Sequence, residues 1–119
     1  MSTPKHRELG VWQRAIDLVM ESHRLAERFP PHERFELASQ VRRAAASIPA
    51  NIAEGNGRLH RGDYIHHVSI ARGSLMELDS HLELARRLNY VGEADLVLAR
   101  ELIDRVGRML TRLAMRLRM

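Results

Sequence analysis

The sequence predicts an all-α protein: an antiparallel up-down-up-down four-helix bundle that forms one domain over residues 1–119. Two observations carry this prediction. Apolar residues recur at alternating three- and four-residue steps in four segments, and glycine or proline separates those segments. Aromatic residues make up only 4% of the chain, so the core must consist mainly of Leu, Ala, Val, Ile and Met.

The first two predicted helices are joined by a proline pair. The first runs from about Leu9 to Phe29, and Pro30 and Pro31 end it. Its expected core positions are Leu9, Trp12, Ile16, Val19, His23 and Ala26. The second begins near His32 or Glu33, continues to Glu54 and stops at a glycine-rich turn. Its expected core positions are Leu37, Val41, Ala44, Ile48 and Ile52.

The third predicted helix has the strictest repeat of the four. Its core positions follow each other at steps of four and three residues without a break: Tyr64, Val68, Ala71, Leu75, Leu78, Leu82 and Ala85. Asn89, Tyr90 and Gly92 then interrupt the pattern before a fourth helix, from about Ala94 to Arg118. Its expected core positions are Ala99, Ile103, Val106, Leu110, Leu113 and Leu117.

Pro49 lies inside the second predicted helix, where proline removes a backbone donor and kinks or strains the chain. Ser47, Asn51 and Glu54 surround it. We interpret them as structural, because Ser47 and Asn51 can satisfy the loosened backbone and Glu54 can pair with an arginine. The alternative is a polar functional cluster.

The third predicted helix carries more apolar surface than one core face explains. Ile70, Gly73, Leu84 and Leu88 project away from the repeat. This is either a wide apolar stripe within one bundle or a subunit interface, at which Gly73 would allow two helices to approach closely. We favour self-association.

The net charge of +4 comes from 18 arginines and one lysine, Lys5, against 15 acidic residues. Genomic base composition can favour arginine codons without any functional reason. The alternative is selection for a planar, bidentate binder of phosphate.

Two groups of arginines are candidates for nucleic-acid binding. Arg105, Arg108, Arg112 and Arg116 form one stripe on the fourth predicted helix, and no acidic residue follows Asp104. The second group is Arg42, Arg43, Arg58 and Arg61. The alternative interpretation of the first group is a solvated helix face that complements the helix dipole. The alternative interpretation of the second group is ion pairing with Glu33, Glu36 or Glu54.

Motifs for catalysis and cofactors are missing from the sequence. The chain has no cysteine, which excludes disulfides and thiolate metal sites. Asp63-x-x-His66 is a single shortened copy of a bundle metal motif, and Ser74 follows Gly73 without a nucleophile elbow. We therefore expect no enzyme activity, no metal and no cofactor. No apolar run is long enough for a membrane span and no leader pattern follows Met1, so we expect a cytoplasmic protein.

The chain resembles the four-helix bundle proteins encoded in intervening sequences of 23S ribosomal RNA genes. The resemblance rests on ELGVWQRAIDLV, FPPHERFELASQVRRAAASIPANIAEGNGR, DYIHHVSIARGSLMELDSHLELA and VGRMLTRL, of which SIPANIAEG and IARGSLMEL are the most specific. It implies a ring-shaped homopentamer with a basic surface, nucleic-acid binding and no enzyme activity. A relative by architecture, the accessory variability determinant protein of diversity-generating retroelements, is thought to bring nucleic acid and reverse transcriptase together.

Two residues depart from the family pattern at the start of the third helix. His60 stands where the family usually has a capping serine, and His67 stands where a large apolar residue is common.

From the sequence we predict a non-enzymatic, homo-oligomeric scaffold that binds RNA or DNA through arginine–phosphate contacts, without reading bases. The alternative is a protein-interaction module that docks a partner such as a nucleic-acid enzyme. Salt dependence separates the two, because phosphate contacts weaken steeply with salt and an apolar contact does not.

Overall fold

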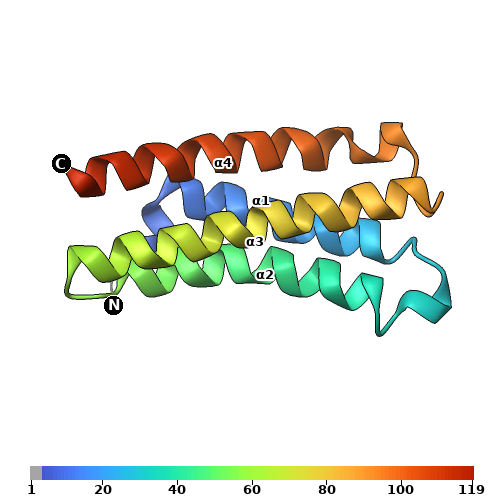
Figure 1. The fold of residues 1–119 in the computed structure, drawn as a ribbon, viewed down its shortest axis with the longest axis horizontal. Coiled ribbons are helices and arrows are strands. Elements are labelled where there is room, and N and C mark those ends of the chain that lie inside the picture. The colour runs from blue at the N-terminus through green and yellow to red at the C-terminus, as the bar shows by residue number, and fades with distance from the viewer. Residues whose placement is uncertain (1–3) are drawn as a thin grey trace.

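The protein was analysed as a computed structural model, which describes residues 4–119. These residues form four long α-helices and no strand: α1 (Gly10–Ala26), α2 (Leu37–Asn56), α3 (Arg61–Arg87) and α4 (Val97–Arg118). Three short 3-10 helices accompany them: η1 (Lys5–Glu8), η2 (Pro31–Glu33) and η3 (Glu93–Leu96). Each long helix runs antiparallel to the one before it, and α4 closes the bundle against α1 (Figure 1). The predicted four-helix bundle is confirmed, and α2 and α4 lie diagonally across it.

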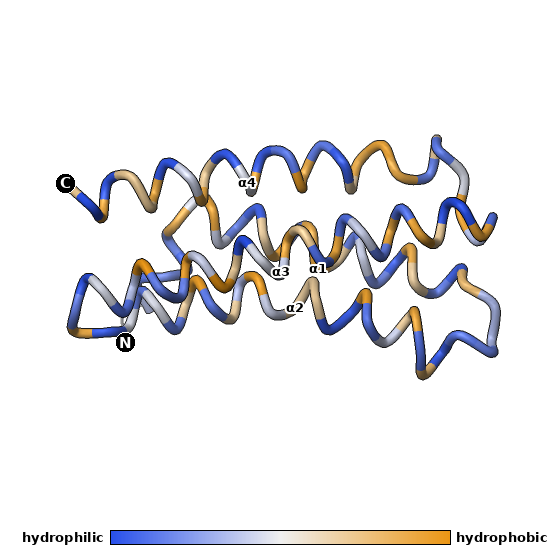
Figure 2. The backbone as a smooth tube through the Cα atoms, viewed as in Figure 1, coloured by the Kyte–Doolittle hydropathy of each residue, from blue (hydrophilic) through white to orange (hydrophobic). Residues whose placement is uncertain are grey.

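The core positions predicted for α2, α3 and α4 are confirmed. All five positions of α2 are buried, and the repeat of α3 is buried from Val68 to Ala85, with Tyr64 partly exposed at its start. In α4 the repeat is buried as far as Leu113, and Leu117 is half-buried. Hydrophobic and hydrophilic residues accordingly alternate along each helix (Figure 2), because only one face of each is buried.

The core face predicted for α1 is wrong by part of a turn. The residues at the centre of the core are Val11, Ala15, Leu18, Ser22 and Leu25. Of the predicted positions, Ala26 is buried, Leu9, Trp12, Ile16 and Val19 are half-buried beside the core, and His23 is exposed. Both sets follow the same three- and four-residue steps. Each set also contains one polar residue, His23 or Ser22, so the periodicity alone does not choose between them.

The second helix begins later than predicted, at Leu37 rather than at His32 or Glu33. Glu33 belongs to η2, and its carboxylate accepts a hydrogen bond from the Leu37 amide at 3.2 Å. It also accepts one from the Tyr90 hydroxyl at 2.7 Å. Glu33 therefore satisfies a free donor at the helix start, which fixes where α2 begins. The first helix likewise ends at Ala26, three residues before the predicted end.

The connection between α3 and α4 explains the late start of the fourth helix. Asn89 adopts a left-handed conformation (φ 63°), and the Tyr90 amide bonds back to the Ala85 carbonyl at 2.9 Å, which ends α3. Asp95 then accepts a hydrogen bond from the Gly92 amide at 2.7 Å and pairs with Arg28 on the neighbouring α1–α2 connection. These contacts hold Glu93–Leu96 as a 3-10 turn, so α4 begins at Val97 and not at Ala94.

The polar residues around Pro49 bind the backbone and the next helix. The Asn51 amide donates to the Ser47 carbonyl at 2.9 Å, and the Ser47 hydroxyl bonds the Ser74 hydroxyl on α3 at 2.8 Å. Glu54 pairs with Arg58 at 2.6 Å. The predicted pairing of Glu54 with an arginine is therefore confirmed. The carbonyl that a proline at position 49 leaves without its donor belongs to Ala45, and Asn51 binds the Ser47 carbonyl instead.

No helix in residues 4–119 combines the length and apolar character that crossing a membrane requires.

Glycine is required at position 55, where α2 packs closely against α3. A Cβ at Gly55 would lie 2.8 Å from the His67 Cβ and 3.0 Å from Tyr64 Cδ1. Gly55→Ala should therefore force the two helices apart and lower the free energy of unfolding by about 1–2 kcal/mol in urea titrations. The matched control is Gly62→Ala, in the first turn of α3, since a Cβ there would meet nothing within 4 Å. It should raise the free energy of unfolding by about 0.5–1 kcal/mol, and equal effects of the two changes would contradict the close contact.

Candidate nucleic-acid interface

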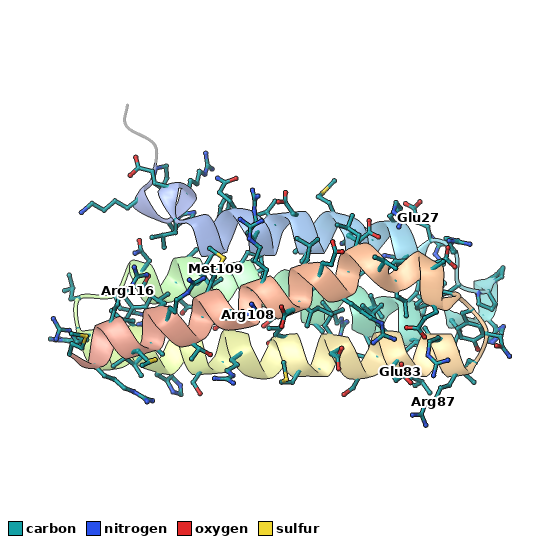
Figure 3. The ribbon with its side chains drawn as sticks, turned by 90° about the horizontal axis from the view of Figure 1, so that it is seen from above. Glu27, Glu83, Arg87, Arg108, Met109 and Arg116 are labelled. Atoms are coloured by element: carbon teal, nitrogen blue, oxygen red, sulfur yellow. The ribbon has the colours of Figure 1, made fainter. Side chains whose placement is uncertain are left out.

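The four predicted arginines of α4 lie on its outward face. Ile103, Val106, Leu110 and Leu113 turn inward to the core, so helical geometry directs the four intervening arginines to solvent, and all four are exposed. Arg108 pairs with Asp104 at 3.0 Å, and both side chains are exposed. Figure 3 shows Arg108 near the middle of α4 and Arg116 near its end.

Three of these arginines carry unneutralised charge. Among the described residues, 4–119, no carboxylate lies within ion-pair distance of Arg105, Arg112 or Arg116. Asp104 is the last acidic residue of α4, and five arginines follow it up to Arg118. The C-terminal half of α4 is therefore a basic helix face, and it also carries positive charge at the negative end of the helix dipole.

The opposite end of the bundle shows the contrasting arrangement. Glu83 accepts hydrogen bonds from Arg86 at 2.9 Å, from Arg87 at 2.9 Å and from Arg100 at 3.0 Å. Glu93 also contacts Arg86 at 3.2 Å and Arg100 at 3.1 Å. The three guanidinium groups hold the pKa of Glu83 well below its ordinary value, first through the hydrogen bond from Arg86. Each guanidinium group around Glu83 (Figure 3) thus has a carboxylate partner, whereas within residues 4–119 Arg105, Arg112 and Arg116 have none.

The second predicted group of arginines does not form one surface with the first. Arg42 is half-buried beside the α1–α2 connection, in a shallow groove with Phe29 and Arg34, and Arg43 is exposed. Both lie on α2, diagonally across the bundle from α4. The alternative interpretation, ion pairing with Glu33, Glu36 or Glu54, does not hold for Arg42 or Arg43, which form no salt bridge among residues 4–119. Glu33 binds the Leu37 amide and the Tyr90 hydroxyl instead.

Arg58 and Arg61 lie at the end of the bundle where α4 finishes. Arg58 is engaged by Glu54, so the predicted ion pair is confirmed for this residue. Arg61 at the start of α3 donates to the Met119 carbonyl at 2.7 Å and so joins this turn to the last residue of the chain. The structure therefore brings Arg61 to the basic end of α4 and separates Arg42 and Arg43 from it.

A groove between α3 and α4 adds a basic residue that the sequence analysis missed. The groove has a volume of about 710 Å³, and Arg108 and Arg112 line it from α4. Arg72 faces them from α3, where it donates to the Thr111 hydroxyl at 3.0 Å, and Thr111 in turn donates to the Gly107 carbonyl at 3.0 Å. Arg72 directly follows the core position Ala71, but the sequence does not say on which side of α3 the fourth helix lies.

The histidines and serines on the α2 side of α3 make structural contacts. His67 Nδ1 lies 3.0 Å from the Asn51 amide oxygen, and Ser74 bonds Ser47 rather than a histidine. His66 is exposed, with its ring 5.8 Å from that of His67. Within residues 4–119, no three His, Asp or Glu side chains gather in a way that would hold a metal ion.

The helical topology and the basic face together define a small four-helix bundle protein with a row of exposed arginines along the outer side of α4. The chain belongs to the 23S rRNA-intervening sequence protein family, whose model matches residues 7–112. A similar fold occurs in a crystal structure from Bacteroides thetaiotaomicron, described as a protein of unknown function from the S23 ribosomal protein family. That protein is 22% identical, with a TM-score of 0.81 over 87% of this chain and 97% of its own. Comparison with curated proteins gave no significant match.

The Glu83 network predicts a specific acid sensitivity. Because the folded state lowers the pKa of Glu83, its contribution to stability is present above the ordinary carboxyl pKa and is lost as the pH falls toward the lowered value. Glu83→Gln should lower the thermal midpoint of unfolding by a few degrees at pH 7. Between pH 5 and about pH 2, the thermal midpoint of the variant should fall less than that of the wild-type protein. Calorimetry over a pH series measures both effects.

The matched control is Glu77→Gln, on the same helix and N-terminal to Glu83. Glu77 is exposed and pairs only with His81, at 3.3 Å, among the described residues. It should have little effect at any pH. Equal pH profiles for the two variants would show that the arginine cluster around Glu83 does not contribute to stability.

Proposed function

We propose that the protein is a non-enzymatic, self-associating scaffold that binds RNA or DNA through the basic face of α4. The observation that supports this most strongly is the unneutralised charge of Arg105, Arg112 and Arg116 on one exposed helix face. Arg108 and Arg61 extend that face, and Arg58 lies near it. Arg42 and Arg43 would contribute separately, from the other side of the bundle.

The dimensions of α4 suit a nucleic-acid backbone. Arg105 to Arg116 spans eleven residues, or about 16 Å of helix. One strand of a duplex carries a phosphate about every 3.4 Å along the axis, so this face is about as long as five phosphates. Arginine contacts with phosphate give affinity and orientation, but no base specificity. The chain has few aromatic residues for stacking on bases, which agrees with binding through the backbone.

Self-association would multiply this face. Ile70, Leu84 and Leu88 are exposed apolar residues on the outer side of α3, and a Cβ at Gly73 beside them would meet nothing. An apolar helix face with an open glycine suits close contact with another helix. We propose that this face forms the subunit contact of a ring-shaped homopentamer, the assembly that the family resemblance implies, with the basic faces repeated around it.

Removing the three unpaired arginines should weaken nucleic-acid binding strongly. Arg105→Ala, Arg112→Ala and Arg116→Ala combined should raise Kd for duplex DNA by on the order of tenfold or more at about 0.1 M salt. The slope of log K against log salt should also become shallower, by roughly 0.9 for each phosphate that the variant no longer neutralises. Fluorescence anisotropy across a salt series measures both.

A control variant with the same change in net charge tests whether binding depends on the position of the arginines or only on the total charge of the protein. Arg28→Ala, Arg34→Ala and Arg87→Ala combined remove three exposed arginines at the opposite end of the bundle. This triple variant should keep most of the affinity and the salt slope. If both triple variants lose affinity equally, α4 is not the binding face, and if the wild-type protein does not bind at low salt, the proposed function is wrong.

Breaking the outer face of α3 should dissociate the oligomer. Leu84→Glu places a charge on that face and should reduce the mass measured by analytical ultracentrifugation to that of a single 13.7 kDa chain. Met20→Glu, on the exposed side of α1, is the control and should leave the assembly unchanged. If the Leu84→Glu variant assembles normally, the subunit contact lies on another face of the bundle.

A further inference from the structure

The first helix does not reach the end of the bundle where α4 finishes. Among the described residues, α1 begins at Gly10, and a Cβ there would lie 3.1 Å from the Met109 methyl group. From Met109, α4 continues for nine more residues to Arg118, or about 14 Å. The start of α3 does reach this end, because Arg61 contacts the Met119 carbonyl. The last turns of α4 therefore extend past the helix that should flank them.

The described 3-10 helix before α1, η1 (Lys5–Glu8), does not occupy this position. η1 packs against α1 and α2. The Gln13 side chain donates to the Arg7 carbonyl at 2.7 Å, and the His6 ring meets Trp12 edge-on at 5.3 Å. These contacts hold η1 beside the first turns of α1, and Figure 3 shows it at the N-terminal end of α1, apart from the end of α4.

A groove with an apolar lining marks the vacant position. It lies between the first turn of α1 and the last turns of α4 and has a volume of about 560 Å³. Its apolar lining consists of Leu9, Val11, Met109, Leu113, Met115 and Met119. Figure 3 shows Met109 directed from α4 toward α1. Methionine side chains are flexible and polarizable, and they are common in grooves that accept helices.

The charge at the edge of the groove selects the occupant. Arg112 and Arg116 line the groove together with the apolar residues, and neither has a carboxylate partner within residues 4–119. An occupant that covers the lining must also offer anionic groups to these two arginines. Phosphates alone satisfy only the arginines, whereas an apolar helix face flanked by Asp or Glu satisfies both parts of the groove.

We propose that this groove, which we call the α1–α4 groove, binds an acidic amphipathic helix of another protein. Bound there, the helix would take the place that α1 leaves open and complete the bundle. Its apolar side would cover Met109 and Leu113, and its carboxylates would pair with Arg112 and Arg116. The inference goes beyond nucleic-acid binding and does not depend on it.

The test uses the methionine methyl groups as site-specific reporters. Full-length protein labelled with ¹³C at the methionine methyl groups is titrated with a synthetic helical peptide that has leucine at three- and four-residue steps and glutamate on both flanks. The methyl signals of Met109, Met115 and Met119 should shift. The signal of Met20 should stay fixed, since this residue is exposed on the outer side of α1 and lines neither groove of α4.

Exchanging the charges of the peptide and of the groove tests whether Arg112 and Arg116 determine which peptide binds. The same peptide with lysine in place of glutamate should bind about tenfold or more weakly. Arg112→Glu with Arg116→Glu should reverse this preference. The neutral pair Arg112→Gln with Arg116→Gln should bind both peptides alike, and it serves as the second variant if the charge-reversed protein does not fold.

Three results would overturn the proposal. The first is no shift of the three groove methionines at millimolar peptide. The second is equal binding of the glutamate and lysine peptides, or an equal shift at Met20, because either would indicate nonspecific apolar contact. The third is a shift of the groove methionines with protein concentration alone and none with peptide, which would assign the groove to a second copy of this chain.

Discussion

The structure depends on burying one continuous apolar face from each of four helices. The core contains few aromatic side chains, so Leu, Ile, Val and Ala must interdigitate closely over the whole length of the bundle. At Gly55 on α2, the neighbouring α3 leaves no room for a side chain. Once these faces are buried, the arginines lie on the outer sides of the helices or at their edges. Among the described residues the buried charged side chain is Glu21, which is 6% exposed and pairs with Arg24.

The distribution of the arginines gives the two ends of the bundle different electrostatic character. Around Glu83 and Glu93 each guanidinium has a carboxylate, so these residues connect α3 to α4 and contribute to holding the fold together. Beyond Asp104, α4 has no acidic residue, and its outward arginines keep their charge. Codon usage or solubility alone would not place the paired arginines at one end of the bundle and the unpaired arginines at the other. This separation therefore supports an anionic partner at one end of the molecule, although it does not identify the partner.

The sequence predicted the helices and three of the four core faces because their periodic patterns were unambiguous. It failed for α1, where two apolar stripes overlap and the buried one passes through Ser22. It also placed the start of α2 too early, because the carboxylate of Glu33 that fixes this start also binds Tyr90, 57 residues away. Arg72 and the α1–α4 groove could not be predicted, since both depend on which helices are neighbours and on where one helix ends relative to another. The periodicity of a single helix carries no such information.

Arg112 connects the two grooves of α4, and this limits what the surface can bind at one time. It lines the α3–α4 groove with Arg72 and Arg108, and it lines the α1–α4 groove with Arg116. A guanidinium group that holds a phosphate has few donors left for a carboxylate. Nucleic acid along α4 and an acidic helix in the α1–α4 groove would therefore compete for the same two arginines. Under both proposals, a protein partner would displace nucleic acid from this end of the bundle, and Arg105, which lines neither groove, would remain available for phosphate.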